Sequence, residues 1–249
     1  MRLNKFISHH TTYSRREADK LIFEGKVKVN SKVIKEPGYI VEDKDKVSIN
    51  SKPVKRSTKY TCIVYNKPKG ELVTKKDDRG RKTIYDSLPK KYKHFIPVGR
   101  LDFASEGVLI LTDSPKVAHA LMNSSLPRVY KLKIKGEITE DMIEAMEKGI
   151  VSTKGAHEKS DIKELEIKPF LSYQIIKNSP KYSVLKVAIS EGKNRELRRF
   201  FAHFGKDVVD LKRLSYGWVS LNALPTGKSR YFNKKEYKML KEFLRKKSD

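Results

Sequence analysis

An aspartate in a glycine-flanked loop has the sequence setting of a catalytic carboxylate. Asp102 follows Arg100 within the segment Pro97–Gly107, and the apolar run Val108–Leu111 comes directly after this segment. Glycines at positions 99 and 107 permit backbone geometry and close substrate approach that other residues resist. A carboxylate on such a loop, ahead of a rigid strand, could serve acid-base or nucleophilic chemistry. A turn aspartate that bonds nearby backbone amides is the alternative, and spacing alone favours that alternative.

A second segment carries arginines that could accompany such an acid. The pattern predicts a helix that Asn194 can cap and Gly205 can end, with an apolar stripe formed by Leu197, Phe200, Phe201 and Phe204. On another face Arg195, Arg198 and Arg199 fall at i, i+3 and i+4. An arginine beside Asp102 would hold the orientation of the carboxylate. Phosphate groups or solvent are the alternative partners, and spacing alone favours them.

Tyr130 begins an alternating strand that ends at Lys135. The alternation places Tyr130 on the same face as Leu132 and Ile134, so core packing is its default interpretation. A functional tyrosine at this position would stack on an unpaired nucleobase and offer a hydroxyl group.

Other chemistries lack the residues that they need. The only cysteine, Cys62, lies in an apolar run and is interpreted as a buried hydrophobic residue. No glycine-rich phosphate-binding loop is followed by Lys and Ser or Thr, and no carboxylate cluster typical of a metal-dependent nuclease is evident. Neither metal-type pairing nor a Ser-His-Asp order is found among the six histidines, which are His9, His10, His94, His119, His157 and His203. We therefore expect no metal site.

The charge of the chain predicts a polyanionic partner. Among 249 residues, 55 are Lys or Arg and 30 are Asp or Glu, which gives a formal net charge of +25. A hydrophobic content of 38% argues that this charge lies on folded domains, and such a surface binds nucleic acid by releasing counterions. An acidic membrane surface or a generally basic composition would also fit the charge. The N-terminus lacks the apolar stretch of a secretion signal, so we expect a cytoplasmic protein without membrane association.

The elements that must position these residues fall into two unequal domains. Residues 1–50 predict two helices and a small sheet, because Ser14 and Glu17 form a capping-box pattern and valines alternate around the turn-prone pair Asn30-Ser31. The polar positions of this module form a basic face suited to RNA phosphates, and its candidate RNA-binding residues are Arg2, Lys5, Arg15, Arg16 and Lys20. For any one of them an ordinary solvated position is the simpler interpretation. Residues 51–59 are polar and predict a linker.

Residues 60–249 predict a larger domain of mixed α+β structure. Strands are expected over 61–66, 108–111, 129–135, 183–189 and 208–211. Helices are expected over 115–122 and 139–148. A last helix follows the possible cap Asn233 and runs into a basic tail.

Together these segments resemble the bacterial ribosomal RNA pseudouridine synthases of the RsuA and RluB type, across essentially the whole chain. The discriminating motif is Gly99-Arg100-Leu101-Asp102, followed by the run from Ser105 to Asp113. The N-terminal segment resembles an RNA-binding module that is named after a ribosomal small-subunit protein. The start of the arginine motif, Asn194-Arg195-Glu196, departs from the Tyr-His-Gln of small-subunit-acting relatives and resembles the large-subunit branch.

The resemblance implies a mainly antiparallel sheet in the larger domain. It also implies a cofactor-free isomerase that converts uridine to pseudouridine in ribosomal RNA. It implies Asp102 as the catalytic carboxylate, Tyr130 as the base-stacking tyrosine and Arg198 as the partner of the aspartate. Arg100, Arg195 and Arg199 are added as RNA-binding candidates. The implied partner is rRNA or a ribosomal assembly intermediate, with the large subunit favoured and a monomeric enzyme expected. A small-subunit enzyme and a non-catalytic rRNA-binding assembly factor remain the alternatives.

Overall fold

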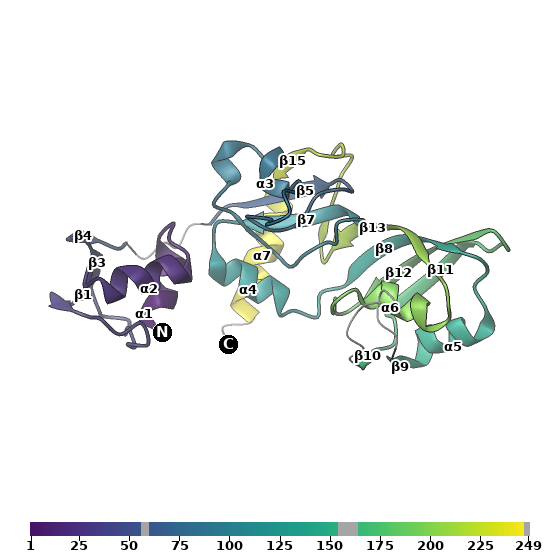
Figure 1. Cartoon of the computed structure of the whole chain (residues 1–249), viewed down its shortest axis with the longest axis horizontal. Coiled ribbons are helices and arrows are strands. Elements are labelled where there is room, and N and C mark those ends of the chain that lie inside the picture. Colours follow the sequence, from purple (N-terminus) through teal and green to yellow (C-terminus); the bar gives the residue numbers. More distant parts are fainter. Residues whose placement is uncertain (56–59, 154–163, 247–249) are drawn as a thin grey trace.

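The computed structural model describes residues 1–55, 60–153 and 164–246. The remaining parts of the predicted linker (56–59), His157 and Lys247 of the basic tail lie outside the described residues. The N-terminal unit contains helices α1 (Leu3–His10) and α2 (Arg15–Phe23) and a four-stranded sheet in the order β2-β1-β3-β4 (Figure 1). Its strands are β1 (Val27–Val29), β2 (Lys32–Val33), β3 (Val47–Ile49) and β4 (Lys52–Pro53).

The start of α2 and the turn between β1 and β2 agree with the local sequence signals. The Ser14 side chain accepts a hydrogen bond from the amide of Glu17, and the amide of Ser14 donates to Glu17 Oε2 at 2.6 Å. This confirms the predicted capping box. Asn30 and Ser31 have φ of 49° and 71° and turn β1 into β2. The buried core of the unit consists of Leu3, Phe6, Ile7, Ala18, Ile22, Val27, Val29, Ile34, Val41, Val47 and Ile49.

The first residues of the predicted linker differ from expectation. Lys52 and Pro53 form β4, which pairs with β3, and Val54 packs against the core of the N-terminal unit. Pro53 is tolerated because proline can occupy a short edge strand without a donor. The paired part of the N-terminal unit therefore extends into the range 51–59.

The larger domain is built on a nine-stranded, mainly antiparallel sheet, which confirms the predicted α+β class. The main path runs β11-β12-β8-β13-β7-β5-β15, with β14 paired to β13 and β6 to β7. Its strands are β5 (Cys62–Lys67), β6 (Ile96–Pro97), β7 (Glu106–Thr112), β8 (Arg128–Lys135), β11 (Ser172–Lys177), β12 (Tyr182–Ile189), β13 (Val208–Tyr216), β14 (Val219–Ser220) and β15 (Ser229–Tyr231). A separate pair joins β9 (Ile150–Ser152) to β10 (Leu165–Ile167). Each strand predicted in this domain is present.

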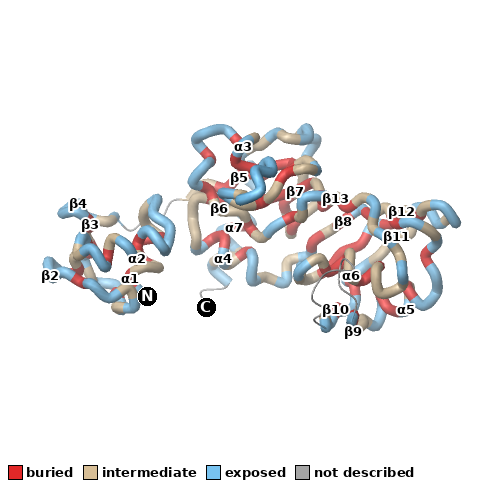
Figure 2. The backbone as a smooth tube through the Cα atoms, viewed as in Figure 1, coloured by how far each residue is buried: buried red, intermediate tan, exposed pale blue. Residues whose placement is uncertain are grey.

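Helices cover the sheet in two groups and enclose two cores. One core, which includes Tyr130, Leu132 and Phe200, packs beneath α3 (Ile84–Ser87), α5 (Glu140–Lys148) and α6 (Glu196–His203). The other, which includes Val64, Val108 and Ile110, packs against α4 (Pro115–Met122) and α7 (Lys234–Lys246). A short 3-10 helix spans Lys90–Tyr92. Figure 2 shows the buried residues concentrated along the central strands and the inward faces of these helices.

Two helix caps were predicted in the larger domain, and they differ in outcome. Asn233 accepts a hydrogen bond from the amide of Glu236 at 2.9 Å, so it begins α7 as expected. The expected cap at Asn194 is wrong. The capping position is Arg195, in a left-handed conformation with φ of 52°, and α6 begins at Glu196. Glu196 accepts a hydrogen bond from the Lys193 amide at 2.7 Å, which fixes the turn without Asn194.

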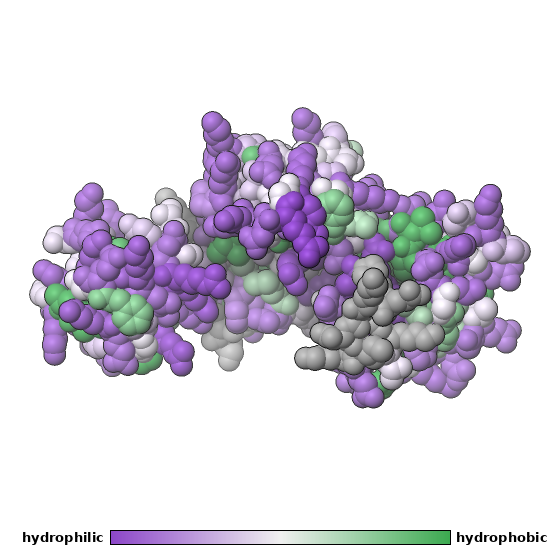
Figure 3. Space-filling view, viewed as in Figure 1, coloured by the Kyte–Doolittle hydropathy of each residue, from purple (hydrophilic) through white to green (hydrophobic). Residues whose placement is uncertain are grey.

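Among the described residues, none of the helices has the length and apolar character needed to cross a membrane. Hydrophilic residues dominate the face of the molecule seen in Figure 3, with only small apolar patches between them. This face of the molecule is therefore predominantly polar.

Candidate active site

The junction of β7 and β13 positions the loop that carries Asp102. These strands run parallel and pair through Lys212 with Glu106 and through Arg213 with Gly107. Gly107 has φ of +109°, and a Cβ there would lie 2.1 Å from the carbonyl oxygen of Arg213. Only glycine allows the two backbones to approach this closely. The glycine noted in the sequence thus serves strand packing beside the loop.

A pocket of about 270 Å³ opens above this junction. It is lined by residues from the Asp102 loop, from β8, from β13 and from the start of α6. Five of the candidate site residues line it together, namely Arg100, Asp102, Tyr130, Arg195 and Arg198. Segments far apart along the chain therefore converge on one small cavity.

The carboxylate of Asp102 lies between two guanidinium groups. Its Oδ2 atom is 3.5 Å from Arg195 Nη1 and 3.7 Å from Arg198 Nε. Arg198 is anchored, because Nη1 donates a hydrogen bond to the Val208 carbonyl at 2.8 Å. Burial and the neighbouring Arg195 lower the pKa of Arg198, and Asp102 opposes this shift. These distances are longer than charge-assisted hydrogen bonds, so the arginines orient the carboxylate and leave its oxygens accessible to a substrate.

A buried lysine holds the Asp102 loop from below. Lys67, at the end of β5, donates hydrogen bonds to the carbonyls of Pro68, Asp102 and Ser105 at 2.9, 3.1 and 2.8 Å. An ammonium group has three donors, and these three carbonyls use all of them. Burial lowers the pKa of Lys67 from 10.5 to about 8, against the opposing influence of Glu71, Asp102 and Glu106.

This pKa shift predicts a pH dependence of folding stability. Between about pH 8 and 10.5 the unfolded chain holds a proton on Lys67 that the folded chain has lost, so the free energy of unfolding should rise with pH in this window. Urea unfolding of the wild type and of Lys67→Met across this range checks it. The wild-type stability should rise more steeply than that of the variant, since other groups titrate equally in both. Parallel curves would contradict the prediction.

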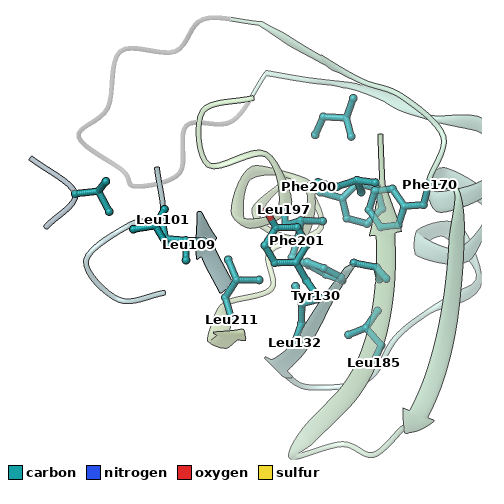
Figure 4. Packing of buried hydrophobic residues seen from close by; sticks show 14 of the residues in the cluster. Leu101, Leu109, Tyr130, Leu132, Phe170, Leu185, Leu197, Phe200, Phe201 and Leu211 are labelled. Carbon is teal, nitrogen blue, oxygen red and sulfur yellow. The ribbon is translucent and has the colours of Figure 1, made fainter. Parts of the chain in front are cut away.

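Tyr130 lies at the wall between the pocket and the core. It is 6% exposed and packs with Leu132, Phe201 and Leu211, as Figure 4 shows. Its hydroxyl is 3.5 Å from Nη1 of the buried Arg213, whose Nε donates to the Val108 carbonyl at 2.7 Å. Both interpretations of this tyrosine, core packing and a place in the site, therefore describe its position.

A second buried arginine lines the same pocket. Arg128 donates to the Ser190 carbonyl at 2.7 Å and to the Tyr216 hydroxyl at 2.8 Å, and its guanidinium lies 4.7 Å from the Tyr216 ring centre. Arg213 lies 5.4 Å from the same ring centre. Both guanidinium groups therefore lie close to the same aromatic ring at the pocket wall.

The remaining sequence candidates lie elsewhere. Arg199 does not line the pocket, and its Nη2 donates to the Ser152 carbonyl at 3.3 Å. The five basic candidates of the N-terminal unit are on or beside α1 and α2, where Lys5 is partly buried and Arg2, Arg15, Arg16 and Lys20 are exposed. Lys20 has Glu24 Oε1 3.9 Å away. Among the residues that the structure describes, no group of three or more His, Cys, Asp or Glu side chains could hold a metal ion.

Sequence reasoning missed the buried basic residues of the site. Lys67, Arg128 and Arg213 all occupy inward positions of strands, at the parity of core residues such as Tyr65, Tyr130 and Leu211. A charged side chain that strand alternation points into the core is costly to bury unless a specific partner compensates its charge. Basic residues at such inward positions are the sequence signal that could have identified these three.

Comparison with known proteins assigns the chain to a family. The family model for RNA pseudouridylate synthase matches residues 61–203, and the model for the S4 domain matches residues 1–47. The chain belongs to the RNA pseudouridylate synthase family. It is therefore an isomerase of the RsuA and RluB type with an N-terminal S4 domain, as the resemblance implied.

Relatives of this synthase match over nearly its full length. An uncharacterized RNA pseudouridine synthase of Helicobacter pylori strain J99 is 52% identical over 249 residues, covering 98% of this chain and 95% of the relative. Ribosomal large subunit pseudouridine synthase B of Bacillus subtilis is 34% identical, with 96% and 95% covered. A crystal structure of a pseudouridylate synthase superimposes with a TM-score of 0.66 at 25% identity, covering 96% of this chain and 99% of the other.

Proposed function

We propose that this synthase isomerises a specific uridine of large-subunit ribosomal RNA to pseudouridine, with Asp102 as its catalytic carboxylate. The observation that carries the proposal is the placement of the Asp102 carboxylate in a pocket, 3.5 and 3.7 Å from two arginines. The named function of the Bacillus subtilis relative and the sequence Asn194-Arg195-Glu196 support the large subunit as the target.

The reaction redistributes bonds within one nucleotide. The bond between uracil N1 and ribose C1′ breaks, the base turns, and C5 bonds to C1′, while the proton lost from C5 is balanced by one gained at N1. No atom is added or removed, so the chemistry requires no cofactor. Attack on the base, attack on C1′ and removal of a ribose proton all use an ionised carboxylate beside the glycosidic bond. Asp102 supplies this group in each of the three routes.

The target base must leave its helix to reach the pocket. Extrusion from structured RNA costs on the order of a few kcal/mol, and stacking on an aromatic ring offsets part of that cost. Tyr130 is the stacking partner, and Arg198 holds the aspartate. Arg100 and Arg195 contact the RNA around the pocket, whereas the surface of the S4 domain with Arg2, Lys5, Arg15, Arg16 and Lys20 contacts phosphates farther away. In this proposal a monomer acts in the cytoplasm on rRNA or on an assembling subunit.

Purified protein and unmodified rRNA transcripts test the proposal. We expect pseudouridine at one position of the large-subunit transcript and none in the small-subunit transcript, mapped by carbodiimide labelling and primer extension. The same position should lack pseudouridine in rRNA from a deletion strain. Modification confined to the small-subunit transcript would overturn the assignment of the large subunit, and tight binding without modification would favour an assembly factor.

Two substitutions distinguish the contribution of the Tyr130 ring to activity from that of its hydroxyl. Tyr130→Phe removes only the hydroxyl that contacts Arg213 at 3.5 Å, and it should lower kcat/KM by less than about 10-fold. Tyr130→Leu removes the stacking ring and should lower it by about 10- to 100-fold. Single-turnover assays on a transcript measure both, with thermal melting as the control for folding. Equal losses for both variants would show that the hydroxyl, and not stacking, is required.

A further inference from the structure

Three lysines lie directly opposite one another on adjacent strands of the large sheet. Lys186 of β12 faces Lys131 of β8, and Lys131 also faces Lys212 of β13. Directly opposed residues project from the same face of a sheet, with Cβ atoms about 5 Å apart. We call Lys131, Lys186 and Lys212 the lysine row.

The lysine row occupies the face of the sheet that points away from α5 and α6. Figure 1 shows these helices on one side of β8, β11 and β12, where they cover the core around Leu132. Side chains alternate along a strand, so Lys131 points to the other side from Tyr130 and Leu132. Lys131 and Lys186 are exposed, and the side chain of Lys212 is 35% exposed.

Negative charge does not balance the row. Glu106 stands opposite Lys212, with Oε1 3.7 Å from its Nζ, and Gln174 stands opposite Lys186. The next acid on this face, Asp210, already pairs with Lys69. Within the described parts of the chain, neither Lys131 nor Lys186 forms an ion pair. Like charges placed directly opposite each other destabilise a sheet, so this arrangement disfavours folding unless an anion lies over it.

The row is adjacent to the pocket along the chain but lies on the opposite face of the sheet. Lys212 stands between Leu211 and Arg213, which line the pocket, and Glu106 directly follows the pocket residue Ser105. An RNA segment other than the one that inserts the target uridine can therefore reach the row. The row extends from β13, which pairs with the strand that follows the Asp102 loop, across β8 to β12.

We propose that the lysine row binds the phosphate groups of a second segment of the folded substrate RNA. The inference rests on the proposed function, since it takes rRNA as the polyanion. Charge complementarity favours this partner, because an RNA backbone supplies closely spaced negative charges and the chain carries a net charge of +25. The row thus contributes affinity and register for a large, folded RNA, while the pocket selects the nucleotide.

A salt series with matched variants tests the row. The test variant is Lys131→Gln/Lys186→Gln/Lys212→Gln, and the control is Lys235→Gln/Lys238→Gln/Lys241→Gln, which removes three exposed lysines from α7. Filter binding to a large-subunit rRNA transcript gives the slope of log K against log salt concentration. Each lost phosphate contact lowers the slope by about 0.7–0.9, so the test variant should lose about 2 to 3. The control should keep the wild-type slope.

Two further readouts decide between RNA binding and general charge. At low salt and saturating enzyme, the test variant should form pseudouridine at the wild-type rate, because the row lies outside the pocket. Its melting temperature should stay close to that of the wild type, because removal of the opposed charges offsets the loss of the Lys212–Glu106 ion pair. An unchanged slope, or an equal decrease of the slope in both variants, overturns the proposal. The lysine row would then bind an acidic protein or face solvent. Wild-type protein that binds the transcript but forms no pseudouridine would instead contradict the proposed function.

Discussion

Asp102→Asn should bind RNA as well as the wild type and form no detectable pseudouridine. The substitution nearly preserves the shape of the side chain and removes its charge and nucleophilicity, so every route through a carboxylate is closed. Loss of a reacting group typically lowers turnover by about 10⁴-fold or more. Single-turnover tritium release from a C5-tritiated transcript, with enzyme in excess, measures the chemical step directly.

The local geometry predicts that this variant stays folded. The Asp102 side chain is 32% exposed and lies 3.5 and 3.7 Å from the two arginines, so the loss of its charge should cost about 1 kcal/mol or less. RNA affinity should be equal or slightly higher, because Arg195 and Arg198 become available to phosphate. Asp78→Asn, at an exposed acid outside the pocket, is the matched control and should keep full activity. Turnover by Asp102→Asn within 10-fold of that control would exclude Asp102 as the reacting group.

Gly107→Ala should be among the most destabilising single-methyl additions in this chain. The new Cβ would lie 2.1 Å from the Arg213 carbonyl oxygen and 2.8 Å from the Arg213 amide nitrogen, both of them backbone atoms. Neither atom can move without separating β7 from β13, and φ of +109° is itself unfavourable for alanine. We expect a loss of about 4 kcal/mol in the free energy of unfolding, together with loss of activity, since this junction supports both the Asp102 loop and Arg213.

Gly80→Ala distinguishes the cost of a positive φ from the cost of steric overlap with a neighbouring strand. Gly80 also has a positive φ, +68°, but a Cβ there would meet nothing within 4 Å. Its substitution should cost only about 1 kcal/mol from backbone strain and should leave activity unchanged. Urea unfolding of both variants gives the comparison. Equal losses would show that the close approach of β7 and β13 is not what requires glycine at position 107.

The sequence determined the features that depend on neighbours along the chain. Alternating and helical periods located the main strands and helices of both domains, and the caps at Ser14 and Asn233 marked two helix starts. The motif around Asp102, taken with Tyr130 and Arg198, indicated the family, and the structure brings these three residues to one pocket. Such signals are readable because the residues that produce them lie within a few positions of one another.

Only the tertiary structure decided what depends on contacts between distant segments. Arg195, in a left-handed conformation, is the capping residue of α6 in place of the expected Asn194, and no short-range sequence pattern predicted this conformation. Lys67 supports the Asp102 loop from 35 residues away, and Arg213 reaches Tyr130 across 83 residues. The register of β8, β12 and β13 places three separate lysines in one row. Local propensity does not encode strand register or the partner of a buried charge, because both are set by the packing of the whole sheet.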